Sequence, residues 1–277
     1  MLVKKTIATL ARGNFRTSLF VVVPDDEVAL YEPVLRTAPI HCILLHTERG
    51  LTRQRKFFRD RMLPGTEIVF IDDDVEAVKI KTPTGLQHCW NLDALAGFVF
   101  QAMTYHSDDC LLAGVYPVAN RDWMAPTVST KNAYIVGAMY FLRNDERVVE
   151  PEEQELEDYA RQLAEQAAGR PTLRFNWIGI QTQYFKNPGG LQDTRTGALR
   201  SRVVNAMVAQ YPSIVKRRLR NPGAIPDLKF LERAVFWDDA PIPSVSAAPS
   251  PSTDPATASA APVAPSEPDA PSGLTPE

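Results

Sequence analysis

Three consecutive carboxylates, Asp72, Asp73 and Asp74, follow a short apolar run in this sequence. Residues 68–71 are branched or aromatic, and we predict a central strand there, buried on both faces. In open α/β sheets ligands bind outside the carboxyl ends of the strands, which places the carboxylates at a ligand site. Alternation along an extended chain points Asp72 and Asp74 the same way, an arrangement that suits a divalent cation holding phosphate oxygens. A solvated acidic loop explains these residues equally well.

A strongly basic helix, expected at residues 51–62, precedes this strand. Arg53 and Arg55 lie in its first turns, where free backbone N–H groups and the positive end of the helix dipole favour an anion. Phosphate is the anion that we expect. Arg59 and Arg61 lie further along, and we expect these two side chains to face solvent.

Acidic side chains crowd the start of a second helix, expected at residues 150–168. Most of them, including Glu150, are expected to complement the helix dipole on a solvated face. Glu157 and Asp158 lie deeper in the helix, beside apolar neighbours, and can face inward.

Two pairs of small residues fit close approaches of the backbone. Gly137 and Ala138 leave space for a ligand or for a neighbouring chain segment, although ordinary packing explains them too. Gly189 and Gly190 suit a mobile lid or an acceptor loop, although a plain turn is the commoner meaning of such a pair.

Residues 186–233 carry ten basic against three acidic side chains, a net charge of +7 within a chain whose formal net charge is -3. Basic side chains gain affinity by releasing counterions from a polyanion, so this segment indicates a phosphate-rich partner. Its densest run is Lys216, Arg217 and Arg218. A solvated basic helix is the alternative.

The elements that must position these residues follow from the periodicity of apolar side chains. Strands alternate with helices, which predicts one large α/β domain of about 240 residues. The expected strands are 18–23, 40–45, 68–71, 77–81, 111–118, 134–142 and 172–181, and the expected helices are one that ends at Leu35, 51–62, 92–105, 150–168 and 199–210.

Composition divides the chain into three parts. Residues 239–277 are almost entirely Pro, Ala, Ser, Thr and a few acids, a composition typical of a disordered tail. We expect residues 1–16 to be an N-terminal extension and residues 17–238 to form the folded domain, with a donor half at about 17–110 and an acceptor half at about 111–238. Arginine and asparagine interrupt the first apolar run, so neither a signal peptide nor a membrane span is predicted.

Several enzyme classes lack their motifs in this sequence. There is no GxGxxG or GxxxxGK[ST] phosphate loop and no GxSxG nucleophile elbow. The four histidines form no metal-spaced pair. Three widely spaced cysteines without a CxxC motif argue against a zinc site or a disulfide framework, and they fit a reducing cytoplasm.

The order of the motifs resembles that of family 2 nucleotide-sugar glycosyltransferases, which have the GT-A fold. In that family an opening strand ends in Pro, a Gly-x-x-x-x-Arg-Asn helix follows, and a later strand runs into Asp-x-Asp. The family's Glu-Asp motif looks like Glu157-Asp158, whereas the late histidine that binds metal in some relatives has no counterpart. The three matching pieces are Val21-Val22-Val23-Pro24, Gly50-Leu51-Thr52-Arg53-Gln54-Arg55-Lys56 (with Lys56 in place of Asn) and Phe70-Ile71-Asp72-Asp73-Asp74.

More closely, residues 17–233 resemble the phage and viral glycosyltransferases associated with TET/JBP dioxygenases, which are predicted to glycosylate hydroxymethylated pyrimidines in DNA. The resemblance implies a GT-A-like, Rossmann-type mixed sheet flanked by helices. It also implies an inverting hexosyltransferase in the host cytoplasm. Its donor would be a nucleoside-diphosphate sugar such as a UDP-sugar, its metal Mn²⁺ or Mg²⁺, and its acceptor DNA that carries 5-hydroxymethylcytosine.

The same resemblance implies a role for each candidate residue. A glycosyltransferase acting on a glycan or a protein, a sugar nucleotidyltransferase, and a non-catalytic DNA-binding protein remain alternatives. The implied residues are Asp158 as catalytic base, Pro24, Arg53, Arg55, Asp72 and Asp73 for the nucleotide sugar, Asp74 and Asp72 for the metal, and Gly189, Gly190, Lys216, Arg217 and Arg218 for the acceptor or DNA.

Overall fold

The computed structural model describes residues 2–182, 196–219, 221, 224 and 226–241 of the chain. These residues lie within one compact unit that spans residues 1–246. Almost all of the tail predicted for residues 239–277 falls outside the described residues, as do Gly189 and Gly190.

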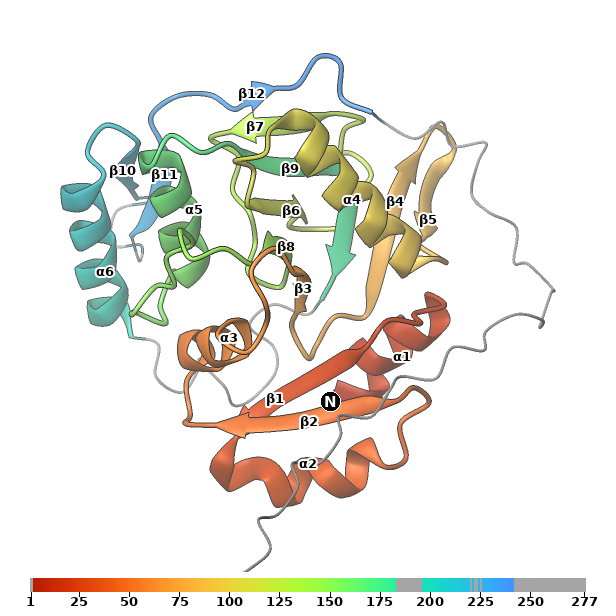
Figure 1. Cartoon of the computed structure of the whole chain (residues 1–277). Helices are drawn as coiled ribbons and strands as arrows, with labels where there is room; N and C mark the ends of the chain where they lie inside the picture. The colour runs from red at the N-terminus through yellow and green to blue at the C-terminus, as the bar shows by residue number, and fades with distance from the viewer. Residues whose placement is uncertain (1, 183–195, 220, 222–223, 225, 242–277) are drawn as a thin grey trace, which may run out of the picture. The chain divides into compact units, whose positions relative to one another are not determined.

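The main sheet is mixed and has eight strands, six of them in the order β12-β7-β9-β6-β8-β3 (Figure 1). The long strand β9 runs parallel to β6, and its other edge pairs antiparallel with β7 in its first half and with β4 in its second half. The predicted mixed α/β class is therefore confirmed. The strands are β3 (Glu67–Ile71), β4 (Ala77–Thr82), β5 (Gly85–His88), β6 (Leu112–Tyr116), β7 (Val128–Lys131), β8 (Met139–Arg143), β9 (Thr172–Gln181) and β12 (Val235–Phe236).

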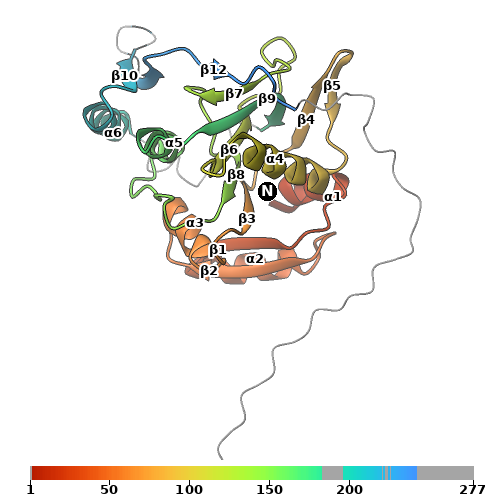
Figure 2. The same cartoon turned by 45° about the horizontal axis from the view of Figure 1, so that its top comes forward.

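A second, two-stranded sheet is parallel and consists of β1 (Leu19–Pro24) and β2 (Cys42–Thr47). Helix α2 (Val28–Leu35) joins the two strands. Figures 1 and 2 show these three elements as a layer of their own, next to α3 (Leu51–Arg59). The predicted strand–helix–strand opening is present, although its second strand begins two residues later than the apolar pattern indicated.

Strand β3 lies at an edge of the main sheet, so the prediction of a central strand buried on both faces is wrong. Among the described strands it pairs with β8 alone, and Val69 keeps 37% of its surface exposed. Its apolar residues serve aromatic packing instead. The Phe70 ring stacks on Tyr140 of β8 at 4.9 Å and meets Phe58 of α3 edge-on at 6.1 Å.

The main core lies between the sheet and α4 (Leu92–His106), which crosses one face of it in both views (Figures 1 and 2). Val99 and Met103 of α4 pack there with Phe141 and Phe175. Asn91 caps the helix by accepting a hydrogen bond from the backbone N–H of Ala94. None of the helices in the described part of the chain combines the length and the apolar character of a membrane span.

A second core joins α5 (Glu157–Ala167) and α6 (Gly197–Gln210) to a hairpin of β10 (Val215–Arg218) and β11 (Asp227–Phe230). Leu163, Val204 and Phe230 are among its buried side chains. Helix α5 begins seven residues later than the predicted helix 150–168, because Leu156 adopts a left-handed backbone with φ 59° immediately before it.

Candidate functional site

Three distant segments meet at the carboxyl end of β3. Arg55 of α3 donates from Nη2 to Oδ1 of Asp72 at 3.1 Å and from Nη1 to Oε1 of Glu157 at 2.5 Å. Its Nη2 also donates to the backbone oxygen of Gly137 at 3.0 Å. The fold therefore brings together the acidic triplet, the basic helix and the Glu157-Asp158 pair, which lie in three separate stretches of the sequence.

The Arg55 side chain is buried, and it is already satisfied by protein groups. Only 5% of the residue is exposed, and two carboxylates and a carbonyl oxygen hold its guanidinium. Burial alone would lower the pKa of Arg55, but the charge of Glu157 first, then Tyr140 and Asp72, raises it well above its ordinary value. Arg53 differs, because it lies on the surface and pairs with Glu48 at 2.9 Å.

The ion pair between Arg55 and Glu157 is part of a longer buried chain of charges that we call the arginine relay. Oε2 of Glu157 forms an ion pair with Arg161, whose Nη2 lies 2.7 Å away, and Arg161 also pairs with Glu150 at 3.1 Å. Glu150 in turn lies 3.6 Å from Arg59. The relay is thus Arg59–Glu150–Arg161–Glu157–Arg55–Asp72, with alternating sign and all members but Asp72 nearly inaccessible to water.

Two expectations about this region are wrong. Arg59 and Glu150 were expected on solvated faces, yet both side chains are buried by their pairing within the relay. The Tyr140 ring forms part of its floor, since the guanidinium carbons of Arg161 and Arg55 lie 4.5 and 5.2 Å from the ring centroid. Such contacts add cation–π attraction to the ion pairs.

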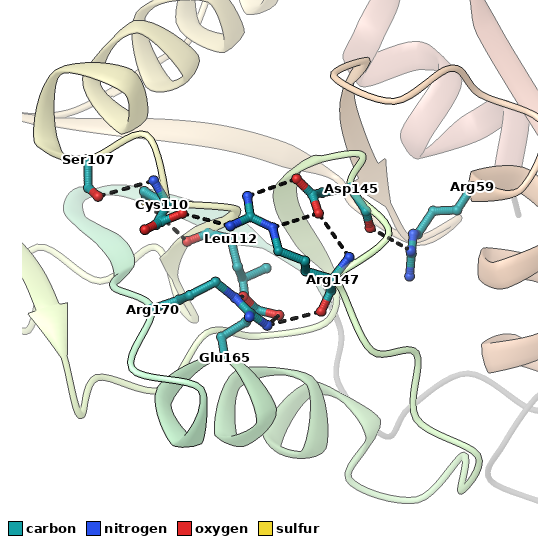
Figure 3. Close-up of polar contacts among 9 residues, drawn as sticks. Arg59, Ser107, Cys110, Leu112, Asp145, Arg147, Glu165 and Arg170 are labelled. Carbon is teal, nitrogen blue, oxygen red and sulfur yellow. Dashed lines mark hydrogen bonds and ion pairs between the residues drawn. The ribbon is translucent and has the colours of Figure 1, made fainter.

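Beyond Arg59, the relay meets a second polar cluster, drawn in Figure 3. Arg59 donates to the backbone oxygen of Asp145 at 3.3 Å. Arg147 binds both carboxylate oxygens of Asp145 at 2.9 Å, and its backbone oxygen accepts from Arg170. Arg170 is paired with the fully buried Glu165 at 2.6 Å. Polar contacts therefore lead from the acidic triplet to Glu165 in the last turns of α5, in two places through the backbone oxygens of Asp145 and Arg147.

The glycine at position 137 makes the relay possible. A Cβ atom there would lie 2.5 Å from Oε1 of Glu157 and 3.6 Å from Nη1 of Arg55. Its backbone N–H points at Oδ2 of Asp158, 3.3 Å away. The sequence allowed a ligand or a neighbouring segment at this position, and the structure places the start of α5 there.

Asp158 is held by donors on three sides. Its Oδ2 accepts from the Tyr134 hydroxyl and the Gly137 N–H, and its Oδ1 accepts from the Tyr159 N–H at 2.8 Å. Burial raises the pKa of Asp158, and the nearby charge of Glu157 raises it further, against the lowering effect of these hydrogen bonds. A carboxylate whose pKa is shifted towards neutrality is suited to general acid–base chemistry.

The N-terminal helix α1 (Thr6–Arg12) fixes the backbone of the acidic loop, a contribution that the sequence reasoning missed. The Thr6 hydroxyl donates to the backbone oxygen of Asp72 at 2.6 Å and accepts from the Val75 N–H at 3.0 Å. The Thr9 hydroxyl donates to the backbone oxygen of Glu76 at 2.7 Å. Ile7 packs in the core of the small sheet and Leu10 in that of the main sheet, so α1 joins both sheets. Two threonines one helical turn apart, flanked by apolar residues, were the available signal.

The triplet itself carries concentrated negative charge. Burial raises the pKa of Asp72 to about 7, against the lowering effect of Arg55, and the charges of Glu157, Asp74 and Asp73 raise it too. Burial and then Asp74 raise the pKa of Asp73, which lies in the turn after β3. The charge of Asp74 therefore makes both Asp72 and Asp73 harder to ionise.

This donor set fits a hard divalent cation such as Mn²⁺ or Mg²⁺. Carboxylate oxygens are the ligands that such ions prefer, and a cation would offset the repulsion that raises these pKa values. Within the described ranges, no three His, Cys, Asp or Glu side chains converge as a ready-made metal cage. Asp72 and Asp74 would therefore hold the ion together with water or phosphate oxygens.

The other candidate residues lie at several places. Pro24 ends β1, opposite Thr47. Lys216, Arg217 and Arg218 are exposed on β10, where Arg218 lies opposite Asp227 of β11.

The basic segment is partly neutralised by acids from the stretch before α5. Arg200 pairs with the buried Glu155 at 2.5 Å, and Arg202 pairs with Glu153 at 3.4 Å. These two arginines are therefore less available to a polyanion than their sequence position suggested. Lys216, Arg217 and Lys229 are exposed on the hairpin, and none of the three pairs with a carboxylate in the described part of the chain.

Two cavities lie away from the triplet. One of about 500 Å³ is lined by residues of α2, of β2 and of the segment between them, including Arg36 and Cys42. The other, of about 330 Å³, lies beside Lys131 and Gln166. Neither is lined by Asp72.

No protein-family model matches this chain, and no curated protein is significantly similar to it in sequence.

Proposed function

We propose that this protein is a metal-dependent glycosyltransferase with a GT-A-like fold, which moves a sugar from a nucleoside-diphosphate sugar to a hydroxyl acceptor. One observation carries the proposal. Arg55 joins the acidic triplet directly to Glu157, the neighbour of Asp158, so the triplet and the Glu157-Asp158 pair lie at one site. A solvated acidic loop has no need of a buried arginine that holds it in place.

In this proposal the acidic triplet binds the donor, most simply a UDP-sugar. Asp72 and Asp74 would hold Mn²⁺ or Mg²⁺, and a bound cation supplies positive charge that stabilises a leaving diphosphate. Arg55 orients Asp72 instead of contacting the donor, because protein groups already occupy its guanidinium. Pro24, the exposed Arg53 and Asp73 contact the nucleotide part of the donor.

Asp158 acts as the general base. Tyr134, Gly137 and the Tyr159 N–H fix its carboxylate, and its raised pKa favours uptake of the proton from the acceptor hydroxyl. The oxygen of that hydroxyl then displaces the diphosphate from the anomeric carbon. A single displacement inverts this centre.

The acceptor that we propose is a hydroxymethylated pyrimidine in DNA, and we place the reaction in the cytoplasm of the host cell. The exposed cations of the hairpin, Lys216, Arg217 and Arg218, support a polyanionic acceptor. In duplex DNA the hydroxymethyl group projects into the major groove, and the enzyme reaches it there or after base flipping.

The test is mass spectrometry of nucleosides after incubation with Mn²⁺, a panel of UDP-sugars and DNA with or without 5-hydroxymethylcytosine. The expected result is a hexose-sized mass gain on the modified DNA only. Asp74→Asn should abolish the gain, whereas the exposed Asp108→Asn should keep it as a matched control.

Other outcomes separate the alternatives. Metal-dependent release of UDP without a gain on DNA would move the acceptor to a glycan or a protein. Pyrophosphate release from a sugar phosphate and a nucleotide would identify a sugar nucleotidyltransferase. DNA binding that needs neither metal nor Asp74, with no turnover of any donor, would identify a binding protein.

A further inference from the structure

Strand β4 carries cations on one face and core residues on the other. Val78 is buried in the main core, so Lys79 and Lys81, which alternate with it, lie on the opposite face. Lys79 lies opposite His88 of β5 and Gly179 of β9 in the strand register. We call this surface the β4 outer face.

The cations of this face have no acidic partners among the described residues. Nζ of Lys79 lies 2.7 Å from Nε2 of His88, a contact between two basic groups. Lys81 donates to the backbone oxygens of Arg121, at 2.8 Å, and of Met124. Burial lowers the pKa of His88, and the charges of Lys79 and Arg12 lower it further. The local field is therefore positive and favours an anion.

Two exposed tryptophans flank these cations. Trp90 is 60% exposed, and its ring centroid lies 5.2 Å from that of His88. Trp123 is 63% exposed and belongs to the loop that Lys81 ties to β4 through Arg121 and Met124. Lys79 and Lys81 are two residues apart on the strand, roughly 7 Å. Trp90 thus lies beside the contact between Lys79 and His88, and Trp123 belongs to the loop that Lys81 holds, so aromatic side chains and cations come from the same part of the structure.

We propose that the β4 outer face binds single-stranded nucleic acid, with Trp90 and Trp123 stacking on bases and Lys79 and Arg121 contacting phosphates. Stacking platforms interleaved with cations characterise single-strand binding, since every base offers an aromatic face. A duplex keeps its bases stacked and offers these tryptophans no partner. An acidic peptide would satisfy the lysines and leave both indole rings exposed.

This surface is distinct from the hairpin of β10 and β11. In Figures 1 and 2 the hairpin lies beyond one end of the main sheet, and β4 and β5 belong to the part of that sheet at the opposite end. The inference does not depend on the proposed glycosyl transfer, since it needs neither donor nor metal. It also places single-stranded rather than paired nucleic acid on this side of the molecule.

The test uses the full chain and a fluorescein-labelled oligodeoxythymidylate of about 15 nucleotides, within the length that one groove covers. Binding is followed by anisotropy and by quenching of tryptophan emission, in EDTA and without a nucleotide sugar. Trp90→Ala with Trp123→Ala should weaken binding at least about tenfold. Lys79→Gln with Arg121→Gln should lower the slope of log affinity against log salt by about 1.4.

Matched controls separate this face from other surfaces. Tyr105→Ala removes an exposed aromatic ring elsewhere and should keep at least half of the single-strand affinity. Lys216→Gln with Arg217→Gln removes two exposed cations of the hairpin and should weaken single-strand binding less than the double tryptophan variant does. Urea unfolding midpoints equal to that of the native chain show that each variant is folded.

Several results would overturn the inference. Among them are absence of single-strand binding at low salt, full binding by the double tryptophan variant, and loss of binding in the hairpin variant alone. Preference for a duplex of the same length, with unquenched tryptophan, would have the same meaning. Since no donor is present, failure of glycosyl transfer leaves this test unaffected.

Discussion

Arg161 and Glu157 lie one turn apart on α5, and Nη2 of Arg161 is 2.7 Å from Oε2 of Glu157. Both side chains are buried. Burying two charges is costly, and the cost is offset only while the partners stay together. Glu157 also pairs with Arg55, so this one carboxylate couples α5 to the acidic triplet.

Removing a charge from the centre of the relay should therefore destabilise the fold. We expect Arg161→Met to lower the free energy of unfolding by about 3–5 kcal/mol, because Glu150 and Glu157 lose a buried partner. Arg53→Met, which removes an exposed arginine, should change it by no more than about 0.5 kcal/mol. Urea unfolding measures both values, and equal midpoints for the two variants would show that the relay adds nothing.

A methyl group at Gly137 should disturb the same charges. The added Cβ would lie 2.5 Å from Oε1 of Glu157, a carboxylate held by Arg55 at this oxygen and by Arg161 at the other, so we expect Gly137→Ala to cost about 1–3 kcal/mol. Gly97→Ala is the control, since Gly97 lies on the exposed side of α4 with no atom within 4 Å of the new Cβ. That variant should gain about 0.5–1 kcal/mol from better helix propensity. A loss at Gly97 as large as that at Gly137 would contradict the steric argument.

The fixed carboxylate of Asp158 leads to a kinetic prediction under the proposed function. Asp158→Asn should lower kcat roughly a hundred- to ten-thousand-fold, because an amide cannot take up the acceptor proton. Donor binding, measured by calorimetry, should stay within about threefold of the native value, or about 0.65 kcal/mol. Tyr134→Phe keeps the carboxylate and loses one donor to it, so its rate should fall less. A normal rate in Asp158→Asn would remove the base from the mechanism.

The contacts of α1 predict a role for Thr6 in holding the acidic loop. Thr6→Val keeps the shape of the side chain but removes the hydroxyl that binds the Val75 N–H and the backbone oxygen of Asp72. We expect it to lower the free energy of unfolding by about 1–3 kcal/mol. Thr37→Val, at an exposed hydroxyl bonded to Val34, should be nearly neutral. Hydrogen exchange at Val75 should quicken in the first variant alone, and unchanged exchange there would show that α1 does not restrain the loop.

Asp145 gives a prediction on pH. Hydrogen bonds from Arg147 lower the pKa of Asp145 to about 2, from an ordinary value of 3.8. A lowered pKa in the folded state stabilises the protein fully above the unfolded value and no longer does so once the pH falls through the folded value. The stability difference between the native chain and Asp145→Asn should therefore be constant above about pH 5 and vanish near pH 2. Arg147→Gln should remove this pH dependence, and its persistence there would assign the effect to another group.

Much of the architecture was predictable, because apolar periodicity reports burial directly. The strand before the triplet, the strand–helix–strand opening and the mixed α/β class all followed from it. The inward direction of Glu157 was also foreseen from its apolar neighbours. Four apolar residues cannot tell a central strand from an edge strand, however, since Phe70 is covered by rings from β8 and α3 rather than by a second neighbouring strand.

The burial of charge was not predictable from local sequence. Arg59 and Arg61 look alike in a basic helix, yet Arg59 is buried against Glu150 and Arg61 is exposed beside Phe57. Only the return of the chain some ninety residues later, in the form of Glu150, separates them. The contacts of Thr6 with Val75 have the same origin, because they join segments that no periodicity relates.

The alternating signs of the arginine relay also constrain how this protein can diverge. Its six charges sum to zero, so losing any one of them leaves an uncompensated ion in the interior. Tolerated changes should therefore come in oppositely charged pairs, such as Arg59 together with Glu150. Homologous sequences, once aligned, should show these positions varying jointly, a correlated signature that would reveal the relay without any coordinates.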